Sequence, residues 1–105
     1  MSHRKQRQLD RTPLDERLLD GIRTVCRAWP VESVSGEMAG YFNELGISIR
    51  LGSTATDLEV ASLRVALIEF LDAFYESLSP PFKWMVMFSR GGRHLDPLIQ
   101  RERDT

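Results

Sequence analysis

The sequence predicts an all-α domain: a small bundle of three main helices followed by short C-terminal helical elements, with one minor strand pair as an alternative. Three observations support this prediction. Apolar residues recur at helical spacing in three segments, capping residues precede these segments, and proline or glycine follows each of them. With 105 residues, the chain can form one domain with a modest core. We therefore expect a single helical domain over residues 12–105, preceded by a flexible basic arm, residues 1–11.

The first helix is expected to begin at Thr12 and to end before Pro30. Thr12 is a favoured N-cap, Pro13 suits the first helical position, and acidic residues follow in the first turn. Seven apolar residues fall within about 140° of arc at helical spacing. They are Leu14, Leu18, Leu19, Ile22, Val25, Cys26 and Trp29.

A shorter second helix is expected to begin at a cap on Ser33 or Ser35 and to end at Leu45, and Gly46 fits the left-handed position that ends many helices. Its apolar face would consist of Met38, Tyr41, Phe42 and Leu45. Residues 47–51, Ile-Ser-Ile-Arg-Leu, then alternate between apolar and polar side chains. This alternation is a strand pattern, although a short one.

The third helix, residues 57–78, has the clearest signals. Thr56 and Glu59 have the spacing of a capping box, and neither glycine nor proline interrupts the segment. Its apolar stripe covers roughly half of the helix circumference. Such a helix needs cover on more than one side, so it is either the central helix of the domain or part of a dimer seam.

Residues 82–88 are a short apolar run that is compatible with a helix or a strand. We expect a helix, because Ser79-Pro80-Pro81 precedes the run and Gly91-Gly92 follows it. As a strand, the run would instead pair with residues 47–51. A last short helix is expected over residues 97–103.

The net charge of −1 hides an uneven distribution. Residues 1–12 contain four basic residues and one acidic residue, whereas residues 13–89 contain six basic and eleven acidic residues. The one cysteine, Cys26, allows no disulfide within the chain. With no signal-peptide pattern and no apolar span of about 20 residues, we expect a cytoplasmic protein without a membrane partner.

The sequence contains no recognisable catalytic or metal-binding pattern, and we expect neither enzyme activity nor a cofactor or metal. The two histidines, His3 and His94, and Cys26 lack the spacing of metal ligands. Cys26 lies on the apolar face of the first predicted helix, where a cysteine behaves as a small buried hydrophobic residue.

The expected function is that of a small intracellular regulator, adaptor or inhibitor that binds another protein and forms a homo-oligomer. Residues 57–88 carry more apolar side chains than so short a chain can bury. Aromatic and methionine residues, which are enriched at interface cores, concentrate between residues 70 and 88. The predicted protein-binding residues are Leu58, Val65, Tyr75, Phe82, Trp84, Met85, Met87 and Phe88.

The alternative is a small nucleic-acid-binding transcriptional regulator that uses the basic N-terminal arm. Residues 36–48 resemble the first helix and turn of a helix-turn-helix motif in their apolar spacing and their Gly-Ile-Ser turn. The glycines and arginines of residues 90–94 can hold a phosphate or a carboxylate. The predicted anion or nucleic-acid contacts are Arg4, Lys5, Arg7, Arg90, Arg93 and His94.

Overall fold

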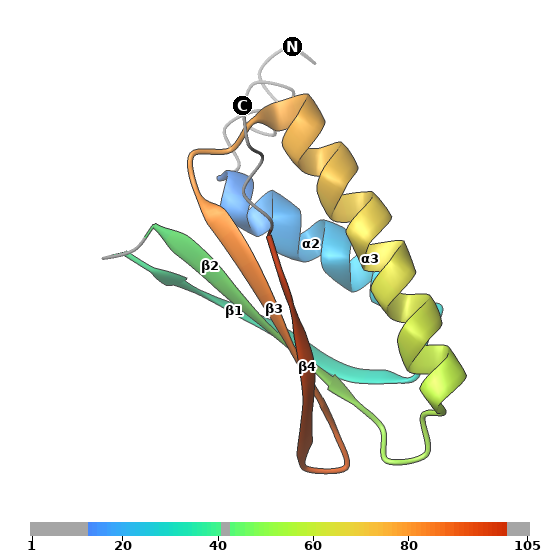
Figure 1. Ribbon diagram of the computed structural model, residues 1–105. Coiled ribbons are helices and arrows are strands. Elements are labelled where there is room, and N and C mark those ends of the chain that lie inside the picture. The colour runs from blue at the N-terminus through green and yellow to red at the C-terminus, as the bar shows by residue number, and fades with distance from the viewer. Residues whose placement is uncertain (1–12, 41–42, 101–105) are drawn as a thin grey trace, which may run out of the picture.

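The chain folds into two helices packed on one face of a four-stranded sheet (Figure 1). The computed structural model describes residues 13–40 and 43–100. The elements are α2 (Leu14–Cys26), β1 (Val31–Ala39), β2 (Glu44–Leu51), α3 (Asp57–Leu78), β3 (Lys83–Arg90) and β4 (Arg93–Ile99). This α+β architecture shows that the predicted all-α bundle is wrong.

The strands lie in the order β1-β2-β3-β4, which is also their order along the chain. The two outer pairs are antiparallel, but the central pair is parallel, with Leu45 opposite Trp84 and Ile49 opposite Phe88. Parallel neighbours cannot be joined by a tight turn, and α3 provides the crossover between β2 and β3.

The core lies between the sheet and the two helices. Alternate residues of β2 and β3 face the helices, as the alternating burial along both strands shows. The helices contribute Leu18, Ile22 and Cys26 from α2 and Leu63, Leu67 and Leu71 from α3. The sheet contributes Leu45, Ile47, Ile49, Leu51, Trp84, Val86, Phe88 and Leu98.

The third predicted helix is confirmed as α3, with the predicted bounds and capping box. The Glu59 backbone N–H donates to Thr56 Oγ1 at 3.1 Å, and the Thr56 backbone N–H donates to Glu59 Oε1 at 2.9 Å. The first predicted helix is also confirmed, as α2, although Pro13 rather than Thr12 occupies the N-cap and the helix ends at Cys26. Neither of these two described helices is long and apolar enough to cross a membrane.

The predicted second helix is wrong. Its described residues lie in β1 and at the start of β2, which pair antiparallel from Val31 opposite Leu51 to Ala39 opposite Glu44. Gly46 therefore lies inside a strand. The resemblance of residues 36–48 to a helix-turn-helix motif is wrong for the same reason, because their described part is extended.

The predicted C-terminal helices are wrong as well. Residues 83–88 belong to β3, which pairs with β2 in the arrangement that the strand alternative anticipated. The segment expected to begin a last helix at Pro97 belongs to β4. Gly91 and Gly92 have φ values of 58° and 80° and form the two-residue turn between β3 and β4.

The predicted basic arm, residues 1–11, lies outside the described residues, as do the last residues of the predicted C-terminal helix.

Candidate protein-binding groove

A groove of about 1260 Å³ runs between α3 and the C-terminal part of β4. In Figure 1, α3 and β4 border the same side of the molecule, with β4 as the outermost strand of the sheet. The lining residues come from both elements and from the start of β3. They are Arg64, Ile68, Asp72, Tyr75, Glu76, Lys83, Trp84, Pro97, Leu98, Ile99 and Gln100.

Two nearly buried side chains, Trp84 and Leu98, form the apolar base of the groove. The backbone beneath them is held by a reciprocal contact with Gln100. The Trp84 N–H donates to Gln100 Oε1 at 3.1 Å, and the Gln100 N–H donates to the Trp84 carbonyl at 3.4 Å. This contact fixes the end of β4 against β3, so the base of the groove is preformed.

Tyr75 lines the groove near the C-terminal end of α3 and connects this helix to the segment before β3. Its hydroxyl donates to the Phe82 carbonyl at 2.8 Å, and the two rings meet edge to face with centroids 6.2 Å apart. Burial raises the pKa of the Tyr75 phenol above its ordinary value. The phenol therefore remains a neutral donor that ties α3 to the segment before β3.

Arg64 lines the groove nearer the N-terminal end of α3 and connects this helix to β4. Its Nη1 donates to the Asp96 carbonyl on β4. Its guanidinium carbon also lies 5.2 Å from the centroid of the Phe88 ring, which is a cation–π distance. Because both contacts engage the guanidinium, Arg64 spans from α3 to the edge of the sheet.

The groove offers apolar contact rather than reactive groups. Ile68 and Ile99 expose 40% and 62% of their surface, and the lining also includes polar side chains: Arg64, Asp72, Glu76, Lys83 and Gln100. Apolar side chains combined with polar ones are typical of protein interfaces. Within residues 13–40 and 43–100, no three His, Cys, Asp or Glu side chains gather as metal ligands would.

Cys26 is not an activated nucleophile. The thiol is buried on α2, and desolvation by burial raises its pKa to about 11. Since the thiolate is the nucleophilic form, a thiol with this pKa is almost entirely unreactive near neutral pH.

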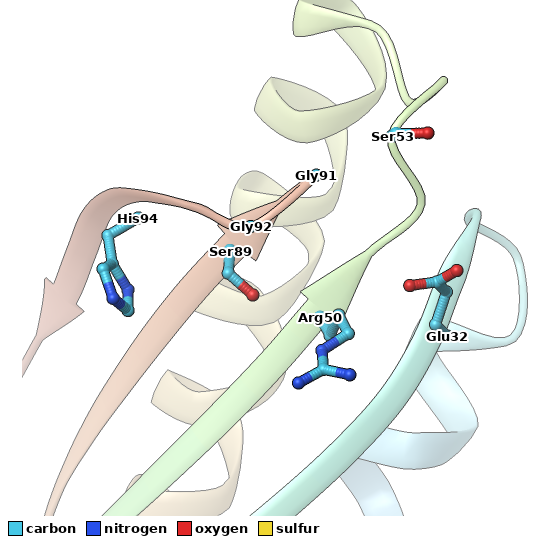
Figure 2. A pocket seen from close by; sticks show the side chains of 7 residues that line it. All are labelled: Glu32, Arg50, Ser53, Ser89, Gly91, Gly92 and His94. Carbon is cyan, nitrogen blue, oxygen red and sulfur yellow. The ribbon is translucent and has the colours of Figure 1, made fainter.

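A second, smaller hollow of about 450 Å³ lies beside the turn between β3 and β4 (Figure 2). Neighbouring strands place Arg50 opposite Ser89 and Ser89 opposite His94. Figure 2 shows Arg50 on β2 next to Glu32 on β1. The hollow therefore contains Arg50 and His94, whose side chains can attract an anion, together with the Glu32 carboxylate, which repels one.

The structure places half of the predicted protein-binding residues at or near α3. Leu58 and Val65 are exposed on α3, outside the groove. Tyr75 and Trp84 line the groove itself.

The other four predicted residues lie elsewhere. Met85 and Met87 alternate with the core residues of β3 and face the side of the sheet that the helices leave open. Phe82 and Phe88 are only 8% and 1% exposed and belong to the core.

Three of the predicted anion contacts lie together in the hairpin of β3 and β4, where Arg90 is opposite Arg93. Arg90 is engaged by Asp57 Oδ1 at 2.8 Å and by the Ala55 carbonyl at 3.2 Å. Arg93 is exposed at the start of β4, and His94 lines the smaller hollow. The other three predicted contacts lie outside the described residues; they are Arg4, Lys5 and Arg7.

Sequence reasoning missed Arg64, Ile68, Leu98 and Ile99 as groove residues. Ile68 carries a usable signal, because it lies three residues after Val65 on the side of α3 that also carries Leu58. Leu98 and Ile99 carry no comparable signal, since their place in the groove depends on the pairing of β4 with β3.

Comparison of the chain with protein-family models, with curated proteins and with solved structures finds no significant match. Its function is therefore inferred from its own residues.

Proposed function

We propose that the chain is a non-catalytic regulator, adaptor or inhibitor that acts by binding another protein in the groove between α3 and β4. The observation that carries this proposal is the exposure of Ile68 and Ile99 beside a preformed apolar base, Trp84 and Leu98. Covering such a surface removes apolar area from water, which stabilises a complex. The proposal includes a cytoplasmic location, because the one cysteine cannot form a disulfide within the chain.

The occupant that fits this groove is a protein segment with aromatic or aliphatic side chains. The outer backbone groups of β4 are a poor template for an added strand, because Pro97 has no N–H to donate. We therefore expect the segment to bind through side chains that pack against Trp84 and between the two isoleucines. Aromatic side chains suit this role because they bury a large area at a low entropic cost.

The nucleic-acid alternative gains no support from the described residues. The described part of the predicted helix-turn-helix segment lies mostly in β1 and β2. In addition, the described residues contain twelve acidic and eight basic side chains, a net charge that repels a polyanion.

A library of short random peptides displayed on phage tests the proposal when it is panned against the purified chain. We expect enrichment of peptides with aromatic and aliphatic side chains. The affinity of a synthetic selected peptide is then measured by fluorescence anisotropy. We expect Ile99→Asp and Trp84→Ala each to weaken binding by about tenfold or more, since both change the apolar lining.

Ser48→Asp is the matched control, because Ser48 is exposed in β2 on the face opposite the groove. It introduces the same charge as Ile99→Asp and should leave peptide affinity unchanged. Trp84→Ala also removes a nearly buried ring, so Ile99→Asp, at an exposed position, provides the decisive comparison. The absence of enriched peptides, or equal binding by the Ile99→Asp and Ser48→Asp variants, would overturn the proposal.

A further inference from the structure

A second apolar surface on α3 consists of Leu58, Ala61, Val65 and Ile68, which we call the α3 seam. All four residues are exposed, and Leu58 and Val65 expose 79% and 57% of their surface. Their successive spacings of three, four and three residues are those of the contact positions in a coiled coil. Of the four, only Ile68 also lines the groove.

The α3 seam is separate from the face of α3 that packs on the sheet. At about 100° per residue, its four positions span roughly 80° of the helix circumference. Their centre lies about 140° from the direction of Leu67, which is fully buried in the core. The side chains of the α3 seam are therefore surplus to the core of a single chain.

We propose that two copies of the chain pair through their α3 seams, with the two helices antiparallel. This proposal goes beyond the proposed function, because it concerns a second copy of this chain rather than the occupant of the groove. Such an interface is isologous: the same surface patch is used by both subunits around a twofold axis.

The spacing along the α3 seam is self-complementary in the antiparallel direction. With the twofold axis level with residue 63, Leu58 lies level with Ile68 of the second copy, and Ala61 lies level with Val65 of the second copy. Every apolar residue of the seam then meets another. The small Ala61 side chain at the middle permits the helices to approach to about 8 Å, the short end of the usual range.

The charges on α3 favour the antiparallel direction over the parallel one. A parallel pair would bring together the acidic first turns of both helices, which contain Asp57 and Glu59. In the antiparallel pair, these two acidic turns instead lie at opposite ends of the interface.

The pairing leaves one end of the groove open. Tyr75 and Glu76 lie beyond the length of α3 that overlaps α3 of the second copy. The end of the groove formed by Tyr75 and Trp84 therefore stays clear of the second helix, whereas Ile68 belongs both to the groove wall and to the pairing surface.

Sedimentation velocity over about 1 to about 100 μM chain tests the pairing. We expect the native chain to have twice the mass of the 12.1 kDa monomer. Leu58→Asp and Val65→Asp should each raise the dissociation constant by about a hundredfold or more, because each would bury an unpaired charge at the interface. Both residues are exposed in the monomer, so the fold should survive, as circular dichroism will verify.

Two control variants separate this proposal from the proposed function. Ala73→Asp introduces the same charge at an exposed position of α3 outside the seam, and Ile99→Asp alters the groove. Both should remain dimeric. A native chain that is monomeric throughout this range, or dimeric Leu58→Asp and Val65→Asp variants, would overturn the pairing without bearing on peptide binding in the groove.

Oxidation of cysteine variants tests the direction of the helices in a Cys26→Ala background. The double variant Leu58→Cys/Ile68→Cys should form a covalent dimer, because each new thiol lies opposite its counterpart on the second copy. Leu58→Cys alone should not, because two copies of residue 58 lie about 15 Å apart along the helix axis. Efficient cross-linking of the single variant would show a parallel pair and overturn the antiparallel arrangement.

Discussion

The Phe70 ring on α3 lies directly against Gly21 on α2. A β-carbon at residue 21 would lie 2.2 Å from Phe70 Cζ and 2.8 Å from its Cε1, far inside van der Waals contact. The ring is also held by Phe74, with centroids 6.0 Å apart. The missing side chain at Gly21 is therefore what allows the two helices to approach at this point.

We predict that Gly21→Ala lowers the free energy of unfolding by about 1 to 3 kcal/mol, the range for forcing extra atoms into a packed site. Helix propensity alone predicts the opposite sign, since alanine is favoured over glycine by about 1 kcal/mol inside a helix. Urea unfolding measures the difference. The control is the same substitution in a Phe70→Leu background, where the smaller side chain leaves room and the loss should shrink. Stabilisation by Gly21→Ala in the native background would contradict the contact.

We predict that Arg64→Met lowers the free energy of unfolding by about 1 to 2 kcal/mol, through loss of the hydrogen bond to the Asp96 carbonyl and of the cation–π contact with Phe88. Arg50→Met is the matched control, because it removes the same charge from an exposed side chain on β2. The two urea midpoints should differ, with Arg64→Met the lower. Equal midpoints would show that the bridge across the end of the groove contributes nothing to stability.

We predict that Cys26 in the folded chain reacts with a thiol reagent at about pH 8 at least a hundredfold more slowly than in concentrated urea. With a pKa of about 11, roughly one thiol in a thousand is ionised at that pH, whereas a thiol with the ordinary pKa of 9.0 is ionised to about one tenth. The absorbance of the released reagent follows the reaction. Rapid labelling without denaturant would show that the thiol is accessible and ionised.

The same shift predicts a pH dependence of stability. A thiol whose pKa is raised by folding stabilises the folded state below its unfolded value of 9.0, and this contribution is lost as the pH rises to about 11. The difference in free energy of unfolding between the native chain and Cys26→Ala should therefore narrow across that interval. A difference that stays constant across the interval would contradict the raised pKa.

The helix α3 could be predicted because all its local signals agree. Its cap at Thr56, its uninterrupted length and its apolar stripe all indicate the same structure. β3 could not be assigned in this way, because its run of consecutive apolar residues has neither the period of a helix nor that of a strand. The run is apolar because β3 lies between two other strands inside the sheet. What decides its conformation is pairing with β2, which lies on the other side of α3 in the sequence.

β1 lacks the regular two-residue alternation of a strand because of one bulge and one glycine, whereas the predicted helix was based on Met38, Tyr41, Phe42 and Leu45. The register with β2 shifts by one residue between Val31 and Ser33, so the inward-facing Val31 and Val34 are three residues apart. The next inward position is Gly36, which has no side chain, and the one after it is Met38. The resulting spacings of three and four residues imitate a helix on an extended backbone.

β4 contains the same kind of irregularity. Leu95 pairs with Phe88 and Leu98 pairs with Val86, so the inward-facing leucines are three residues apart rather than two. This spacing conceals the strand period in the segment that was expected to begin a helix. The groove was missed for the same reason, because one of its walls is β4.

The exposed residues Leu58 and Val65 were identifiable from the sequence, since they lie off the main apolar stripe of α3. In contrast, the residue type of Phe88 did not show that this side chain would be buried rather than exposed as Leu58 and Val65 are. Its position in a central strand, under the guanidinium of Arg64, places it in the core.

The bulges in β1 and β4 have a consequence for how the molecule behaves when crowded with copies of itself. A regular edge strand is a template on which further strands can grow without limit into fibrils. Here both outermost strands are irregular, and Pro97 further interrupts β4. The exposed apolar side chains of α3 lie on a helix, whose backbone donors and acceptors are already paired within the helix. Association through these side chains therefore stops at a closed dimer.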